Sequence, residues 1–306
     1  MAKGKRLGVR LKKQLGYHLL IFPAVVLTVI FNYIPMGGLV IAFKDYRLRS
    51  GIWKSAWCGL DNFRNIFSDY YMPQIILNTV GIGVLSIIIS MPVVIIFALL
   101  LNEIRSTGFK RVVQTVSYLP HFISWIIMAV ILTALFSAKD GVVNQMLLSV
   151  GLLSKPLNIL TSRDSYWLMT VTASVWKEMG WSAILYLAVI SGIDETIYEA
   201  AKIDGAGRFA RMWYITLPQL RGIIAINLIL SVGSIPHVGF DQAYYLSNNV
   251  NIERANTLSY YIYNTGMVNA RFSYATAVGL VLSVISATLM LCANTASNRL
   301  TGRGLY

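Results

Sequence analysis

Two ionisable residues stand in the middle of an otherwise apolar stretch of the sequence. Lys177 and Glu178 lie in SVWKEMGWS, with Trp176 and Trp181 close by. If the stretch is a membrane helix, a rise of 1.5 Å per residue places the pair roughly 15 Å deep, near the bilayer midplane. Ionisable groups cost free energy there unless they face a cavity or a partner. Tryptophan faces can pack on sugar rings while the charges bind hydroxyls, so the segment predicts a sugar site.

An alternative follows if the membrane span in this stretch starts later in the chain. Lys177 and Glu178 would then lie at the membrane–water interface instead of at its midplane. The neighbouring tryptophans would belong to the aromatic belt that membrane proteins form at this level, with no role in binding.

A second polar segment, TIYEAAKIDGAGRFARMWYITLP, separates two apolar blocks and ends at Pro218. Thr196 and Glu199 fit the S/T-x-x-E capping box, in which two free N–H groups of a helix start are satisfied reciprocally. The helix is expected to end at Gly205, where a left-handed turn costs no Cβ clash, and RFARMWYI to form a second helical piece. Small side chains in the first helix would let another surface approach closely. The segment is either a protruding docking knob, or a connector in which Glu199 only caps its own helix.

The elements that must position these residues are membrane helices. The chain has 306 residues, of which 56% are hydrophobic and 13% charged, whereas a soluble domain carries roughly a quarter charged residues. About 20 apolar residues cross a bilayer, and backbone groups in lipid must be satisfied within a helix. The predicted class is therefore all-α, a polytopic membrane protein with six transmembrane helices. The predicted spans are residues 17–43, 75–101, 118–136, 167–193, 222–238 and 274–293, the fifth being the weakest because GSIPHVGFDQ interrupts it.

The distribution of basic residues predicts the orientation. With six spans both termini share one side, and fifteen of the 26 Lys and Arg residues lie on it, against ten in the three opposite loops. Cytoplasmic loops carry the basic excess, so both termini are expected in the cytoplasm. The predicted domains are a basic cytoplasmic segment 1–16, a transmembrane domain 17–297 containing the loop 194–221, and a cytoplasmic tail 298–306. The net charge of +13 is then a topology signal, and no nucleic-acid partner is expected.

Catalytic and nucleotide-binding motifs are missing from the sequence. It contains no G-x-x-x-x-G-K-[ST], no H-E-x-x-H, no C-x-x-C and no G-x-S-x-G. The chain is therefore predicted not to be an enzyme and to hold no metal or cofactor of its own. Transport driven by hydrolysis would need a partner ATPase.

The polar loop resembles the EAA signature of ABC-importer permeases, which reads E-A-A, three residues, G, nine residues, I-x-L-P. The spacing is kept without departure. The resemblance implies that this loop holds a coupling helix that docks on a cytoplasmic ATPase, with Glu199 paired to a basic residue there. The implied ATPase-coupling residues are Glu199, Ala200, Ala201, Asp204, Gly205, Ile215, Leu217 and Pro218.

Further segments narrow the resemblance to carbohydrate-type permeases, and within these to the polysaccharide (LplB-like) branch, related to the maltose-type permeases. They are GLDNFRNIF, YLPHFIS, GVVNQMLLSVGL and FDQAYYLSNN. The resemblance implies a type I ABC importer permease fold, without the large extracytoplasmic insertion of some maltose-type permeases. The family's sugar-lining windows contain Ser174, Trp176, Lys177, Glu178, Trp181, Ser231 and Ser234. Trp176 matches a family aromatic, whereas Lys177 and Glu178 depart from its small or apolar residues, which suggests a polar or charged cargo.

The resemblance also implies the partners. They are a second permease subunit that is similar but not identical to this one, two cytoplasmic subunits that bind ATP and Mg²⁺, an extracytoplasmic solute-binding protein and an oligosaccharide cargo. The implied location is the bacterial plasma (inner) membrane. Alternating access would then carry the cargo across. The alternative class is a stand-alone secondary transporter or channel in which the Lys177–Glu178 pair relays protons, a class that typically shows inverted repeats.

Overall fold

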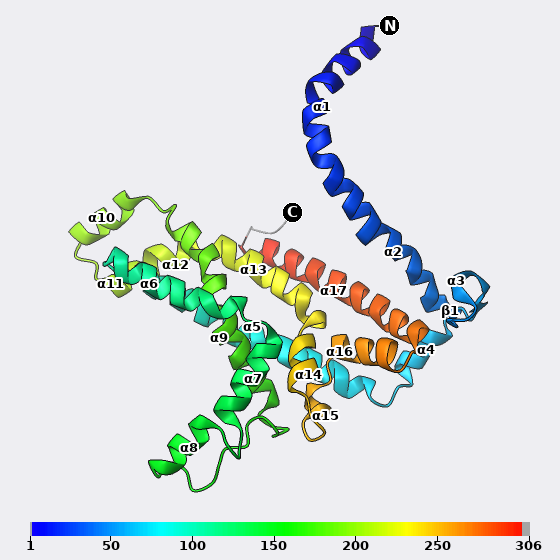
Figure 1. Cartoon of the computed structure of the whole chain (residues 1–306). Helices are drawn as coiled ribbons and strands as arrows, with labels where there is room; N and C mark the ends of the chain where they lie inside the picture. The colour runs from blue at the N-terminus through cyan, green and yellow to red at the C-terminus, as the bar shows by residue number, and fades with distance from the viewer. Residues whose placement is uncertain (1, 302–306) are drawn as a thin grey trace. The chain divides into compact units, whose positions relative to one another are not determined.

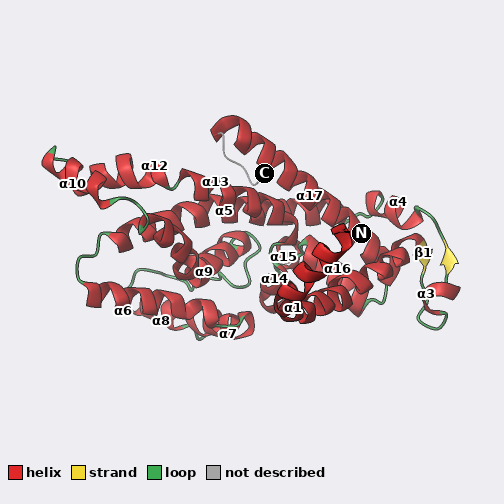
Figure 2. Cartoon of the chain, turned by 90° about the horizontal axis from the view of Figure 1, so that it is seen from above, coloured by secondary structure: helices red, strands yellow, loops and turns green. Residues whose placement is uncertain are grey.

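The computed structural model describes the backbone of residues 2–301 and the side chains of residues 14–299. Nearly all of this part is helical, and one short strand pair interrupts it (Figure 1, Figure 2). The chain divides into two compact units, Met1–Ser68 with Thr265–Leu280 and Asp69–Asn264 with Val281–Tyr306. The predicted all-α class is thus confirmed.

The smaller unit starts with one long helical run. Its elements are α1 (Ala2–Thr28), η1 (Val29–Tyr33), α2 (Ile34–Met36), η2 (Gly37–Phe43), β1 (Lys44–Asp45), α3 (Gly51–Lys54), β2 (Ala56–Trp57), α4 (Asp61–Phe67), most of η6 (Asn264–Val268) and the start of α17 (Phe272–Thr301). The strands pair antiparallel, with Lys44 opposite Trp57. Asn62 closes this hairpin by donating from Nδ2 to the Ala42 carbonyl at 2.9 Å, and the Tyr46 N–H donates to Ser273 Oγ at 2.9 Å.

The larger unit holds all of the predicted site residues. Its elements are α5 (Met72–Asn102), α6 (Thr107–Tyr118), η3 (Leu119–Phe122), α7 (Trp125–Phe136), α8 (Val142–Ser149), α9 (Tyr166–Ile190), α10 (Glu195–Ile203), α11 (Arg208–Arg211), η4 (Met212–Thr216), α12 (Leu217–Gln219), α13 (Arg221–Ser234), η5 (Ile235–His237), α14 (Phe240–Leu246), α15 (Ile252–Ala255), α16 (Leu258–Tyr263) and the rest of α17.

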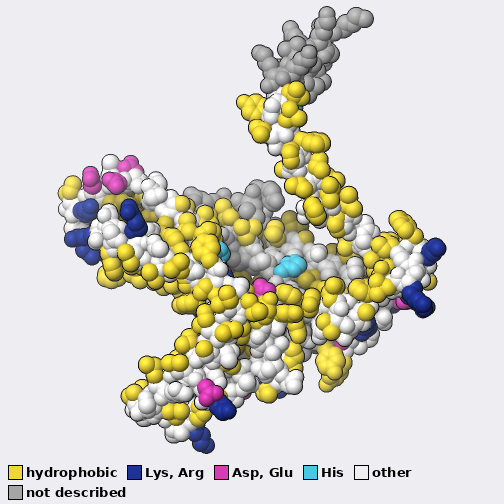
Figure 3. Space-filling model, in the orientation of Figure 1, with side chains coloured by type: hydrophobic (Ala, Val, Ile, Leu, Met, Phe, Trp, Pro, Cys, Tyr) yellow, Lys and Arg dark blue, Asp and Glu magenta, His cyan; other side chains and the backbone are white. Residues whose placement is uncertain are grey.

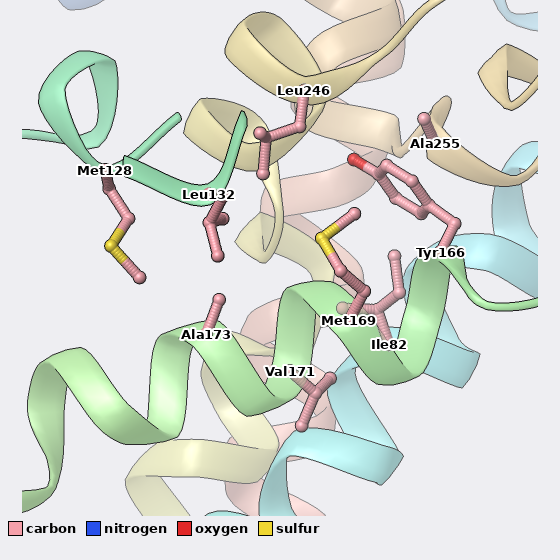
Figure 4. Packing of buried hydrophobic residues seen from close by; sticks show 9 residues of the cluster. All are labelled: Ile82, Met128, Leu132, Tyr166, Met169, Val171, Ala173, Leu246 and Ala255. Carbon is pink, nitrogen blue, oxygen red and sulfur yellow. The ribbon is translucent and has the colours of Figure 1, made fainter. Parts of the chain in front are cut away.

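Helices α5 and α9 pack along each other at the centre of this unit. Figure 4 shows the buried cluster that forms around α9, with side chains from α5, α7, α14 and α15. Its members are Ile82, Met128, Leu132, Tyr166, Met169, Val171, Ala173, Leu246 and Ala255. Close packing of this kind gains dispersion energy, which drives helix association where lipid is as apolar as the side chains.

Polar side chains tie the irregular segment around α15 to the two central helices. Asn78 on α5 donates from Nδ2 to the carbonyls of Glu253 and Asn256, at 2.7 and 2.9 Å. Trp167 on α9 donates from Nε1 to the Arg254 carbonyl at 3.1 Å. Buried carbonyl groups outside helices need such partners, so these bonds allow the chain to leave helical structure here.

The structure does not confirm the predicted number of six membrane-spanning helices. Among the described residues, three helices are long and apolar enough to cross a membrane singly, namely Gln14–Phe43, Met72–Asn102 and Phe272–Arg299. Two further candidates are pairs, Thr107–Phe122 with Trp125–Phe136, bent by 105°, and Arg208–Gln219 with Arg221–His237, bent by 60°. Prolines in the sequences YLPHF and TLPQL accompany both bends, because proline removes a helical N–H donor.

Helix α9 is long enough to cross a membrane, with 25 residues, but it is not among the described helices that are apolar enough to be candidate spans. It carries the Lys177–Glu178 pair within its apolar sequence. The three single helices expose most of their apolar side chains. In the most apolar 18-residue stretch of each helix, the share of buried residues is 0% in Gln14–Phe43, 17% in Met72–Asn102 and 22% in Phe272–Arg299. Such surfaces fit contact with lipid or with other subunits.

Gly180 tests the packing of α6 on α9. A Cβ atom at this position would lie 2.1 Å from the Ser117 carbonyl oxygen, so the helices could not keep their distance. We expect Gly180→Ala to lower the free energy of unfolding in detergent by about 1–3 kcal/mol, the usual cost of overpacking. Gly108→Ala, in α6 and with nothing within 4 Å of the added atom, is the control. Equal stability of the two variants would contradict this packing.

Candidate functional site

The predicted capping box at the start of the polar loop is wrong. Helix α10 begins at Glu195, and Asp194 is its N-cap, with Oδ1 accepting from the Thr196 N–H at 2.9 Å. This backbone hydrogen bond lowers the pKa of the Asp194 carboxyl below its ordinary value of 3.8. Glu199 is therefore not needed to cap the helix, and its carboxylate is exposed.

The left-handed turn predicted at Gly205 is present. Gly205 has φ +79°, and its N–H donates to the Lys202 carbonyl while the Ala206 N–H donates to that of Ala201, at 3.1 and 2.8 Å. This pair of bonds is the Schellman motif that ends many helices. The chain then continues through α11 and η4, as expected for a helix, a glycine turn and a second helix.

The segment between α9 and α13 forms a protruding polar loop in which α10 lies at the tip (Figure 1). Ala200 and Asp204 are exposed, whereas Ile215, Leu217 and Pro218 are partly buried at its base. Tyr198 ties the two helical pieces together through a 2.9 Å hydrogen bond between its hydroxyl and Thr216 Oγ1. Acidic and basic side chains gather around α10 and α11 in Figure 3.

Two exposed apolar side chains on this loop were not among the predicted site residues. Ile203 is 88% exposed and Phe209 is 81% exposed, on either side of the Gly205 turn. The sequence indicates their exposure, because both are large apolar residues close to Gly205, a turn glycine that must lie at the surface. Exposed apolar groups within a charged loop indicate a contact surface.

A cavity of about 410 Å³ lies among α5, α9 and α13. Of the predicted sugar-lining residues it brings together Trp181, Ser231 and Ser234. Its other lining residues are Gly83, Ser86, Ile87, Ser90, Met91, Val94, Ser182, Leu185, Tyr186, Asn227 and Val238. We call it the α5–α9–α13 cavity; none of these residues is charged.

The sequence reasoning missed most of this polar lining. Asn227, Ser231 and Ser234 lie on α13 at spacings of four and three residues, which places them on one face of a helix. Ser86 and Ser90 are likewise four residues apart on α5. The usable signal was therefore a polar stripe with helical periodicity inside apolar blocks.

Other predicted sugar-lining residues lie elsewhere. Ser174 lines an adjoining cavity of about 210 Å³, where its hydroxyl accepts from Gln242 Nε2 at 3.1 Å. Trp176 lines a third cavity of about 370 Å³ whose walls come from α7 and α9 and are mostly apolar. The structure thus separates Trp176 from Trp181.

Lys177 and Glu178 do not line any of these cavities. Lys177 is 6% exposed, and its Nζ donates to the His121 carbonyl and to Glu178 Oε1, both at 2.8 Å. Glu178 Oε2 accepts from His121 Nδ1 at 2.6 Å. Helix α9 begins at Tyr166, so both residues lie well inside a continuous helix.

The residues that the structure describes contain no group of three or more His, Cys, Asp or Glu side chains arranged to hold a metal ion. The candidate site consists of the polar loop around α10 and the uncharged α5–α9–α13 cavity.

Residues 90–302 match the family described as "Binding-protein-dependent transport system inner membrane component". The chain belongs to this family. Over 97% of its length it is 40% identical to Protein LplB of Bacillus subtilis (strain 168), covering 92% of that protein. Over 99% it is 38% identical to the polygalacturonan/rhamnogalacturonan transport system permease protein YteP of the same organism, covering 94%.

The fold agrees with this assignment. A bacterial ABC transporter involved in the import of the acidic polysaccharide alginate has a chain that superposes with a TM-score of 0.88 at 35% identity, over 97% of this chain and 99% of that one. The same transporter in complex with an alginate pentasaccharide-bound periplasmic protein gives a TM-score of 0.88 over 98% of this chain and 100% of that one.

The chain is therefore a multi-pass membrane permease subunit of the carbohydrate ABC-importer type, with the type I permease fold. It is not an enzyme, since the ATPase of such transporters is a separate subunit. The resemblance drawn from the sequence is confirmed. The alternative of a stand-alone transporter or channel is wrong.

The N-cap of α10 predicts a measurable effect. Asp194→Ala removes the acceptor for the Thr196 N–H, so amide exchange in the first turn of α10 should become faster at neutral pH. Asp194→Asn keeps an acceptor and should stay close to wild type. Because the folded-state pKa of Asp194 is lowered, the protection is present above the ordinary aspartate pKa and is lost as pH falls through the lowered value. Hydrogen–deuterium exchange that is equal in both variants would contradict this cap.

Proposed function

We propose that this chain is one of two permease subunits of an importer that carries oligosaccharides or complex glycans across the bacterial plasma membrane. A second permease subunit is needed, since each chain carries one coupling loop and one share of the path, and in this proposal it is similar to this chain but not identical. Two cytoplasmic subunits bind ATP and Mg²⁺, and a solute-binding protein delivers the cargo from outside. The single observation that carries this proposal is the exposed α10 loop with its EAA spacing.

The α10 loop suits docking of an ATP-binding subunit. The Glu199 carboxylate is exposed and, within the described residues, makes no ion pair, so it is available to a basic partner residue. Ile203 and Phe209 add exposed apolar area, whose burial would stabilise the complex. The Gly205 turn fixes the angle between the two helical pieces, so a push on α10 is transmitted to α13.

A six-span topology accommodates these elements. The three long apolar helices, α9 and the two bent pairs each cross the membrane once in this arrangement. Both termini and the loop 194–221 then lie in the cytoplasm, on the side with the larger number of Lys and Arg residues.

The α5–α9–α13 cavity is the proposed place of cargo contact, with Ser174 beside it. Serine hydroxyls, the Asn227 amide and the Trp181 ring suit the hydroxyl groups and ring faces of a sugar. The relatives' names include alginate, an acidic polysaccharide, and polygalacturonan. Since the cavity has no charged lining residue, this chain is expected to bind the ring faces and hydroxyl groups of the cargo and not its carboxylates.

A charge reversal tests the coupling role. Glu199→Lys in the tagged chain should weaken retention of the ATP-binding subunit in mild detergent by about thirtyfold or more, the cost of losing a paired interface charge. Glu195→Lys is the matched control, because Glu195 is exposed one turn earlier on the same helix. Mass spectrometry of the co-eluting proteins measures the effect. Retention of the ATPase by Glu199→Lys at the wild-type level would refute the coupling role.

Two tryptophan substitutions test the cargo site. Trp181→Ala should raise the Kd of the assembled importer, purified without its binding protein, for labelled alginate pentasaccharide by about tenfold. Trp176→Ala should leave the Kd within about twofold, because Trp176 lines a separate apolar cavity. Equilibrium binding checks both, and a larger effect at Trp176 would place the cargo elsewhere. A polygalacturonan oligosaccharide serves as the second probe.

A further inference from the structure

At the break between α6 and α7, the charged residues of α9, buried Lys177 and half-buried Glu178, contact the chain. Helix α6 tightens into the 3-10 helix η3 (Leu119–Phe122), residues 123–124 leave helical structure, and the chain turns by 105° between Thr107–Phe122 and Trp125–Phe136. The His121 carbonyl lies in this last turn before the break, where α-helical hydrogen bonding stops. Carbonyl groups freed at such breaks need a partner inside a membrane protein. The Lys177 ammonium supplies it, at 2.8 Å.

Three polar contacts form a closed loop around this carbonyl. Lys177 bonds the His121 carbonyl and Glu178 Oε1, and Glu178 Oε2 bonds the ring of the same histidine. A lysine that is 6% exposed is tolerated only if its charge is paired, and Glu178 provides that pair at 2.8 Å. Lys177 therefore fixes the backbone of His121, Glu178 fixes its ring, and the two charged side chains fix each other.

The His121 imidazole supports the Trp181 ring, which forms the aromatic part of the cavity wall. The His121 ring stacks on the Trp181 ring at 4.4 Å between centroids and 2° between planes. Phe122 meets the same indole edge-on at 5.7 Å. Trp181 lines the α5–α9–α13 cavity and is 44% exposed. The indole is thus held from the side of the break while its remaining surface faces the cavity.

We propose that Lys177, Glu178 and His121 are positioning residues that fix the Trp181 ring in the cavity wall, and that they act on cargo through this ring and not by direct contact. The placement of Trp181 stands on the contacts of this chain alone. Its effect on glycan binding rests on the proposed function. The Lys177–Glu178 pair within the apolar helix α9 then needs no charged cargo to explain it.

The first experiment reads the environment of Trp181 without any cargo. Its emission is isolated in the assembled importer by subtracting the spectrum of the matched Trp181→Phe protein. In Lys177→Met this emission should shift to longer wavelength and become more accessible to acrylamide, because the indole loses its stacked support. Lys155→Met, at an exposed lysine, is the control and should change nothing.

A second variant protects the test against misfolding of the first. His121→Leu removes the stacked ring while leaving its backbone carbonyl for Lys177, and should produce the same spectral shift. If either variant assembles normally and its Trp181 emission is unaltered, the positioning role is overturned. This outcome does not depend on which glycan the importer binds.

A double-mutant cycle on glycan binding completes the experiment. Lys177→Met and Trp181→Ala should each raise the Kd for alginate pentasaccharide by about tenfold, and the double variant by no more than Trp181→Ala alone. Additive effects would mean direct contact of Lys177 with cargo and would overturn the proposal. If the wild-type importer binds none of the glycan probes, the proposed function fails, while the emission experiment still decides the role of Lys177.

Discussion

The fold depends on one constraint, which is that backbone groups released at helix breaks must find partners where water is scarce. At the break after α6, the Lys177 ammonium bonds the His121 carbonyl. Around α15, the Asn78 side chain bonds two carbonyls, and Asn251 Nδ2 bonds the Leu160 carbonyl at 3.0 Å. Each of these side chains bonds a carbonyl where the chain leaves a helix, which is why residues that cost free energy in lipid are present in this sequence.

The electrostatics of the larger unit follow from the same constraint. The Lys177 charge is neutralised by Glu178 within α9, and the α5–α9–α13 cavity has only neutral polar and apolar walls. As the proposed cargo path, such a cavity avoids strong binding to one charged group, which would hold a cargo too tightly to release it. Stacking and hydroxyl contacts are weaker individually and suit a chain of sugar units.

The α10 loop is built differently from the helices that surround the cavity. Its helix ends are satisfied locally, by the Asp194 cap and by the Schellman motif at Gly205. Its shape therefore needs few contacts with the rest of the chain, and Ile203 and Phe209 remain exposed. A loop that is rigid through local bonds can present one surface to a partner and move as a body when the partner moves.

The sequence by itself determined the helical membrane class, the family and the turn at Gly205, because apolar block length, motif spacing and a glycine at positive φ are local properties. It misplaced the cap of α10 by two residues, since Thr196 and Asp194 are both acceptable N-caps. Only the tertiary structure decided which residues share a cavity. Trp176 and Trp181 are five residues apart, and at 3.6 residues per turn they point to different sides of α9. The carbonyl that Lys177 bonds belongs to His121, 56 residues away in the chain. It lies at a helix break whose position in space no local pattern specifies.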